Sequence, residues 1–179
     1  INKLNTMSNN IILESRFTTH QKTHLILSIG APFILVIFLL IRLDLTYLGS
    51  LVLLLFIISY SAIICLAFTK TGLLKKRDKL YRGLYFAKKL ILKKKIDLTN
   101  KSKVSILKFK RNQKMAWFSA AKPDLALEYN AFDVTLLNDK HTQKKMLVSL
   151  SNKDISKKTV EYLETNFSMK FEIYSPDFS

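Results

Sequence analysis

The chain has 179 residues, of which 49% are hydrophobic, and its 29 Lys and Arg against 13 Asp and Glu give a net charge of +16. A single cysteine excludes an intramolecular disulfide and a cysteine-based metal centre. Only four glycines and three prolines are present, which excludes collagen-like and proline-rich repeat architectures. The length is enough for one small domain beside a membrane segment.

Two apolar runs without Asp, Glu, Lys or Arg lie in residues 23–69, and a short turn that contains Arg42 and Asp44 separates them. Each run is long enough to cross a hydrocarbon layer of about 30 Å as a helix. The first run is too long for the core of a signal peptide, so we expect it to be retained. The sequence therefore predicts a transmembrane helical hairpin with helices over His24–Leu43 and Tyr47–Phe68.

Four positions in the predicted hairpin are candidates for packing between membrane helices: Gly30, Pro32, Ser61 and Cys65. Pro32 lacks an amide proton, so the carbonyl of Ser28 loses its helical partner and a kink is expected. Ser61 and Cys65 are four residues apart and share one helix face, which suits a contact between helices. The apolar runs hold no acidic or basic side chain, which argues against an ion or proton path.

The positive charge is concentrated directly after the hairpin. Residues 70–122 carry eighteen basic and two acidic side chains, whereas residues 1–69 carry four and two. Basic residues that flank membrane spans stay on the cytoplasmic side. We therefore expect the N-terminal segment, residues 1–22, and the C-terminus to be cytoplasmic. The expected location is a bacterial cytoplasmic (inner) membrane, with an organellar inner membrane as the alternative.

Residues 70–82 are predicted to form a basic juxtamembrane connector, helical over Leu73–Tyr81, before a domain that covers residues 83–179. In that domain, short segments rich in branched and aromatic residues alternate with polar turns, which is typical of antiparallel strands. The predicted strands are Leu84–Lys95, Val104–Lys110, Met115–Ala120, Phe132–Leu137 and Met146–Leu150, with a turn at Asn138–Gln143.

An amphipathic helix is predicted near the C-terminus. Ser151 or Asn152 can cap it, and Ser151 with Asp154 has the spacing of a capping box. One stripe holds Ser156, Val160, Leu163 and Phe167, and the polar face holds Lys157, Lys158, Glu161 and Glu164. A last strand is expected at Met169–Tyr174. The predicted fold class is therefore α+β: a two-helix transmembrane hairpin, then a small antiparallel β domain with a C-terminal amphipathic helix.

This order of elements resembles that of membrane-anchored bacterial proteins with a two-helix hairpin and a pleckstrin-homology-like (PH-like) domain. The resemblance covers about Tyr47 to Phe167 and rests on layout, not on a signature motif. It implies a small barrel or sheet closed by the C-terminal helix. Lys108, Lys110 and Arg111 are only loosely like the basic phosphoinositide-binding pattern of eukaryotic members. A plain α+β sandwich with an open sheet is the alternative.

The sequence offers no arrangement of residues typical of catalysis or metal binding. The histidines are His20, His24 and His141, and the first two are four apart without a third ligand or a metalloprotease motif. His141 falls in a predicted turn, where a role in the turn is more frequent than that of a catalytic base. A glycine-rich phosphate loop is also missing. We therefore expect a non-enzyme without cofactor or metal.

The basic block is the remaining candidate for binding. Near an anionic leaflet each lysine contributes about 1 kcal/mol of attraction, which decays within a Debye length. Because the hairpin already holds the chain at the membrane, such a patch would orient the domain against lipid headgroups or an acidic protein. The candidate residues are Lys75, Lys76, Arg77, Lys79, Arg82, Lys88, Lys89, Lys93, Lys94, Lys95, Lys108, Lys110 and Arg111.

These features favour a non-enzymatic accessory or structural subunit of a larger membrane protein complex. Its partners would be other integral membrane subunits and the anionic lipids of the membrane. The alternative is a free-standing PH-like module that binds anionic lipid. Nucleic acid is disfavoured as a partner, because no RNA- or DNA-binding signature accompanies the basic block.

Overall fold

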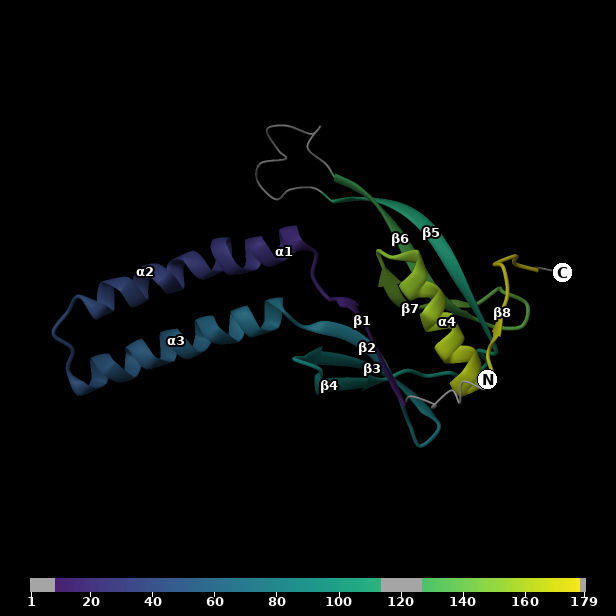
Figure 1. Ribbon diagram of the computed structural model, residues 1–179, viewed down its shortest axis with the longest axis horizontal. Helices are drawn as coiled ribbons and strands as arrows, with labels where there is room; N and C mark the ends of the chain where they lie inside the picture. Colours follow the sequence, from purple (N-terminus) through teal and green to yellow (C-terminus); the bar gives the residue numbers. More distant parts are fainter. Residues whose placement is uncertain (1–8, 114–126, 178–179) are drawn as a thin grey trace, which may run out of the picture. The chain divides into compact units, whose positions relative to one another are not determined.

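The computed structural model describes residues 9–113 and 127–177, so the strand predicted at Met115–Ala120 lies outside the described residues (Figure 1). Within that part of the chain the fold is α+β, with an N-terminal helix pair and two sheets. The chain divides into two compact units. The core unit is Ile1–Glu14, Leu73–Arg82 and Lys94–Ser179, and the hairpin unit is Ser15–Gly72 and Gly83–Lys93.

The helix pair of the hairpin unit consists of two apolar helices that lie side by side (Figure 1). Both are long and apolar enough to cross a membrane, at 23 and 21 residues. The hydroxyls of Thr18 and Thr46 cap them by accepting backbone N–H groups of the first turn. The first helix runs through α1 (Thr19–Thr23), the π-helix η1 (His24–Ile29) and α2 (Gly30–Ile41), and the second is α3 (Tyr47–Ala67).

The π-helical segment η1 ends at Ile29, directly before Gly30 and three residues before Pro32, where the sequence predicts a kink. Pro32 cannot donate a hydrogen bond to the preceding turn, and such a gap is a recognised cause of irregular helix geometry. The hydroxyl of Tyr60, on α3, donates to the carbonyl of Ile26 in η1, at 3.5 Å. Gly30 permits this approach, because a Cβ at this position would overlap the Tyr60 ring.

The first sheet has the strand order β1-β2-β3-β4. Two-residue turns join β2 to β3 at Arg77–Asp78 and β3 to β4 at Ala87–Lys88, and all four turn residues have positive φ. This backbone is that of a type I′ turn, which joins neighbouring antiparallel strands. The strands are β1 (Asn10–Ser15), β2 (Lys70–Lys76), β3 (Lys79–Phe86) and β4 (Lys89–Lys95).

The helix predicted over Leu73–Tyr81 is wrong, because these residues form the β2–β3 hairpin. Leu73 and Leu80 are both buried. A spacing of seven residues places two side chains on one helix face, but a hairpin brings them to the same core equally well. The turn is made by Arg77 and Asp78, without the Asn-Gly or Asp-Gly pair that signals a hairpin. The single strand expected over Leu84–Lys95 is divided between β3 and β4, because a second such turn lies at Ala87–Lys88.

Strand β1 was not predicted, and it changes the place of the hairpin in the fold. It precedes the helices in sequence and lies next to β2 in the sheet. The amide of Lys75 donates to the carbonyl of Asn9 at 2.8 Å, and the amide of Arg16 donates to the carbonyl of Thr69 at 3.0 Å. The helix pair is therefore inserted between two adjacent strands. The predicted cytoplasmic segment 1–22 contributes a strand to the folded domain.

The second sheet has the order β7-β6-β5-β8. β5 and β6 pair antiparallel from Lys103↔Leu137 to Gln113↔Leu127, whereas β8 pairs with β5 in parallel at two positions only. A register shift at Val134/Thr135 interrupts the pairing of β6 with β7. The strands are β5 (Lys103–Gln113), β6 (Leu127–Leu137), β7 (Lys144–Leu150) and β8 (Lys170–Phe171).

Helix α4 (Lys153–Phe167) packs on the second sheet (Figure 1). The side chain of Asn152 caps it by accepting from the amides of Asp154 and Ile155. The carboxylate of Glu14, from β1, accepts from the amides of Ser151 and Asn152 at 2.7 Å, where negative charge favours a helix start. The helix and both sheets bury one core, which includes Leu13, Leu73, Leu80, Val104, Val134, Leu136, Leu147, Val160 and Leu163.

Candidate functional site

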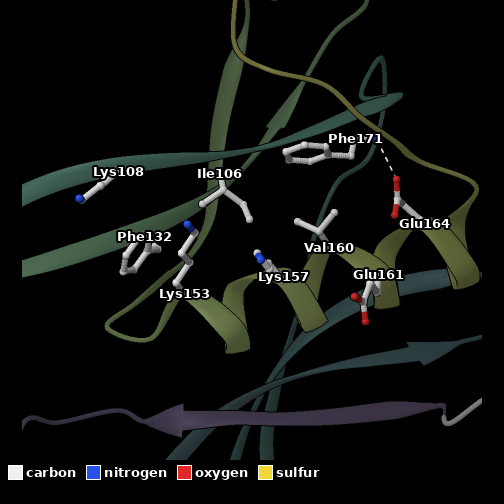
Figure 2. Close-up of a pocket in the computed structure, with 9 residues that line it drawn as sticks. All are labelled: Ile106, Lys108, Phe132, Lys153, Lys157, Val160, Glu161, Glu164 and Phe171. Carbon is white, nitrogen blue, oxygen red and sulfur yellow. Dashed lines mark hydrogen bonds between the residues drawn. The ribbon is translucent and has the colours of Figure 1, made fainter.

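An open groove of about 560 Å³ lies in the core unit between α4 and the second sheet (Figure 2). β5, β6 and β8 supply one wall and α4 supplies the other. The residues that line it are Ile106, Lys108, Phe132, Lys153, Lys157, Val160, Glu161, Glu164 and Phe171.

The middle of the groove is apolar. Ile106 lies on β5, Phe132 on β6 and Val160 on α4, and Phe171 of β8 adds an exposed aromatic ring. The register explains the arrangement, because Phe132 lies opposite Lys108 and side chains two apart on β5 share a face. Ile106 and Lys108 therefore both face α4. An apolar surface of this kind binds an apolar ligand segment more readily than it binds a fully polar ligand segment.

Charged side chains divide the groove into a positive and a negative end. Lys108, Lys153 and Lys157 lie at one end, and Glu161 and Glu164 lie toward the other (Figure 2). The lysine end coincides with the N-terminal half of α4, where the helix dipole adds further positive potential. A ligand with apolar groups and an acidic end fits this polarity.

One edge of the groove is a strand with few partners. Along the edge that faces β8, the described part of the chain pairs β5 only at Lys103 and Val104. Backbone amides of β8 and its flank donate to the carbonyls of Ser102 and Val104. Every second residue of a strand presents its backbone to the same edge, so Ile106 and Lys108 present theirs beside the groove. Such an edge is a template for an added strand.

The predicted basic candidates are divided between the two compact units. Lys88, Lys89 and Lys93 belong to the hairpin unit, and the other ten belong to the core unit. Only Lys108 lines the groove. The exposed candidates are Lys76, Arg77, Lys79, Arg82, Lys88, Lys89, Lys93, Lys94, Lys95, Lys108 and Lys110.

Three basic candidates bind other groups of the core unit through hydrogen bonds or an ion pair. The ammonium of Lys75 donates to the carbonyl of Asn166 at 2.8 Å, at the C-terminal end of α4 where cations are favoured. The guanidinium of Arg82 donates to the carbonyl of Leu147 at 3.5 Å. Arg111 pairs with the buried carboxylate of Asp133, with 2.6 Å between Nη2 and Oδ2. Because these side chains already have partners in the fold, fewer positive charges of the basic block are available to bind a ligand than its net charge suggests.

The hairpin candidates also differ among themselves. Gly30 is buried against Tyr60, and Phe33 stacks on the same ring with 6.4 Å between centroids. Pro32, Ser61 and Cys65 are exposed on the helix pair. Gly30 therefore packs the two helices against each other, and the remaining three face whatever surrounds them.

The residues that follow β8, up to the C-terminal tail, contact the turn that contains His141. The amide of Ser175 donates to Nδ1 of His141 at 3.0 Å, which fixes the ring proton on Nε2. That nitrogen lies 3.2 Å from Oε2 of Glu172, and the same oxygen lies 2.8 Å from the ammonium of Lys103. His141 is buried, and Tyr174 stacks on it. The predicted turn residue is therefore an anchor for the C-terminal tail.

Acid is expected to loosen this tail through Glu172. The pKa of Glu172 is lowered from 4.5 to about 2, chiefly by the hydrogen bond from Lys103, with a further contribution from Lys170. A carboxylate whose folded-state pKa is depressed stabilises the fold above its unfolded pKa, and this contribution is lost as the pH falls toward 2. Amide exchange at Glu172, whose N–H donates to the carbonyl of Val104, should accelerate across that interval.

Glu172→Gln should remove most of this acid response, since glutamine carries no titrating charge. Glu161→Gln, at an exposed glutamate on α4, is the matched control and should respond to acid like the unaltered chain. An equal acid response of both variants would show that Glu172 does not hold the tail.

Sequence reasoning missed the groove but named most of its helix residues. The sequence places Lys157, Glu161 and Glu164 on the polar face of the predicted helix, and it places Val160 on the apolar stripe. The missing information was which strands lie opposite the helix. The predicted last strand, Met169–Tyr174, contains β8, but the sequence does not show that β8 pairs with β5.

The described residues contain no group of three or more His, Cys, Asp or Glu side chains able to hold a metal ion. Comparisons of this chain with protein-family models, with curated proteins and with solved structures found no match. The candidate site therefore has to be interpreted from its own geometry and charge.

Proposed function

We propose that this chain is a non-enzymatic accessory subunit of a larger membrane protein complex. The helix pair anchors it in the bilayer, and the core unit docks a segment of a partner subunit. The observation that carries the proposal is the groove beside α4, with its apolar middle, its lysine end and its strand edge. These three features favour a peptide segment over a small metabolite.

The expected partner segment is extended, apolar in its middle and acidic at one end. Its backbone would continue the second sheet along β5 where β8 stops. Its apolar side chains would cover Ile106, Phe132 and Phe171, and its acidic end would lie near Lys108 and Lys157. Charge complementarity of this kind sets the direction in which a segment binds.

The finer assignments belong to the same proposal. We infer a PH-like layout, because strands in two sheets precede a single C-terminal helix. The basic charge after the helix pair supports cytoplasmic termini in a bacterial inner membrane or an organellar equivalent. Anionic lipids are the second proposed partner.

The test is extraction from the native membrane in mild detergent, followed by a native gel and mass spectrometry of the band. The unaltered chain should migrate in a large band with partners in fixed proportion. Lys108→Glu with Lys157→Glu should release those partners, because the substitutions reverse the charge at one end of the groove. Lys158→Glu is the matched control, since Lys158 is an exposed neighbour on α4 that does not line the groove.

Migration alone or as a small homo-oligomer would contradict the subunit proposal and favour a free-standing lipid-binding module. Partner loss in both variants would show that overall charge, and not the groove, holds the partner.

A further inference from the structure

Strand β4 presents three consecutive apolar side chains to solvent. Leu90, Ile91 and Leu92 are 40%, 53% and 64% exposed, and every residue of β4 is exposed. Lysines precede and follow them at Lys88, Lys89 and Lys93. We call residues 88–93 the edge segment. Exposed apolar runs on an edge strand invite aggregation unless something covers them.

The geometry of the strand limits what covers the edge segment. Leu90 and Leu92 point to one face of the sheet and Ile91 to the other, because side chains alternate. A helix packed on one face would leave the other face uncovered. β4 is the last strand of its sheet, so a surface that meets the sheet edge contacts side chains from both faces.

The edge segment and the helix pair belong to one compact unit. α3 ends at Ala67 and β2 begins at Lys70, so β2 starts beside the end of the helix. β2 and β3 are nearly equal in length and joined by a two-residue turn, so β3 returns to the level of Lys70 at Tyr85, one residue before β3 ends. The edge segment therefore starts at the end of the sheet that is connected to α3 (Figure 1).

We propose that the edge segment docks on the anionic leaflet from which the helix pair emerges. Leu90, Ile91 and Leu92 reach the boundary of headgroups and acyl chains, and Lys88, Lys89 and Lys93 bind anionic headgroups. The backbone of β4 stays among the hydrated headgroups, because an open strand edge is not tolerated in hydrocarbon. This docking is independent of the groove and of any partner subunit.

The test uses the full chain with Cys65→Ala as a cysteine-free parent and a fluorophore at Ile91→Cys. The chain is reconstituted in phosphatidylcholine vesicles with about one third phosphatidylglycerol, and in phosphatidylcholine alone. In the anionic vesicles, lipid-borne nitroxides should quench the label, and iodide access should be several-fold lower than for a label at Lys158→Cys. The second label sits on an exposed position of α4.

Lys88→Gln with Lys89→Gln should reduce the protection at residue 91, because charge attraction is removed while Leu90 and Leu92 remain. Equal iodide access at residues 91 and 158 in the anionic vesicles would overturn the proposal. Protection that follows the protein-to-lipid ratio and ignores lipid charge would overturn it too, and would indicate that a second copy covers the strand.

Discussion

Replacing Arg111 with methionine is expected to destabilise the core unit by about 2–4 kcal/mol, because it leaves the buried carboxylate of Asp133 without its counter-charge. The Asp133 side chain is 7% exposed and its carboxylate lies 2.6 Å from the guanidinium of Arg111. Removing the cation leaves this carboxylate without its counter-charge in a desolvated position. The Arg111 side chain is itself 40% exposed, which places the effect below that of a fully buried pair. The midpoint of thermal unfolding in detergent should fall by roughly 5–15 °C.

Two further variants separate this effect from a general loss of positive charge. Lys110→Met removes a neighbouring exposed lysine and should leave the midpoint nearly unchanged. Arg111→Met combined with Asp133→Asn should be more stable than Arg111→Met alone, since no uncompensated charge remains. If Arg111→Met behaves like Lys110→Met, the pair is not structural and Arg111 returns to the set of candidate binding residues.

Replacing Gly30 with valine is expected to separate the two helices of the hairpin unit. A side chain at residue 30 overlaps the Tyr60 ring, and that ring is held by Phe33 and by its hydrogen bond to Ile26. In a membrane, close contact through small residues supplies much of the attraction between helices. Overpacking of this kind costs about 1–3 kcal/mol. The thermal midpoint in detergent should fall and the aggregated fraction should rise.

The matched control is Ala31→Val, which adds bulk at the adjacent exposed position and should be tolerated. A smaller partner should restore the fit, so Gly30→Val with Tyr60→Ala should recover part of the lost stability. Equal effects of Gly30→Val and Ala31→Val would mean that the contact with Tyr60 does not hold the helices together.

The two predictions assign different tasks to residues that the sequence had grouped by type. Arg111 was grouped with the lysines for possible binding, yet it neutralises a buried carboxylate. Gly30 was grouped with Pro32, Ser61 and Cys65, yet it alone among them is buried between the helices. Charge and size along a sequence do not reveal which neighbour a side chain meets.

The sequence by itself determined the helix pair, because long uncharged runs of apolar residues have few other stable arrangements. It also determined the strands β5 and β7 and the turn between β6 and β7, where alternation and polar turn residues agree. These features depend on local composition and period. Their bounds moved by only a few residues in the structure.

The tertiary structure decided what depends on contacts between distant residues. It placed β1 beside β2 across the helix pair, and it converted the expected connector into a hairpin with Arg77 and Asp78 in its turn. It also brought Phe171 and Lys108 to one groove opposite α4. Pairing across long stretches of chain leaves no periodic trace in either partner. Leu73 and Leu80 illustrate the reason, since their spacing fits a helix and a hairpin equally and only the shared core selects one.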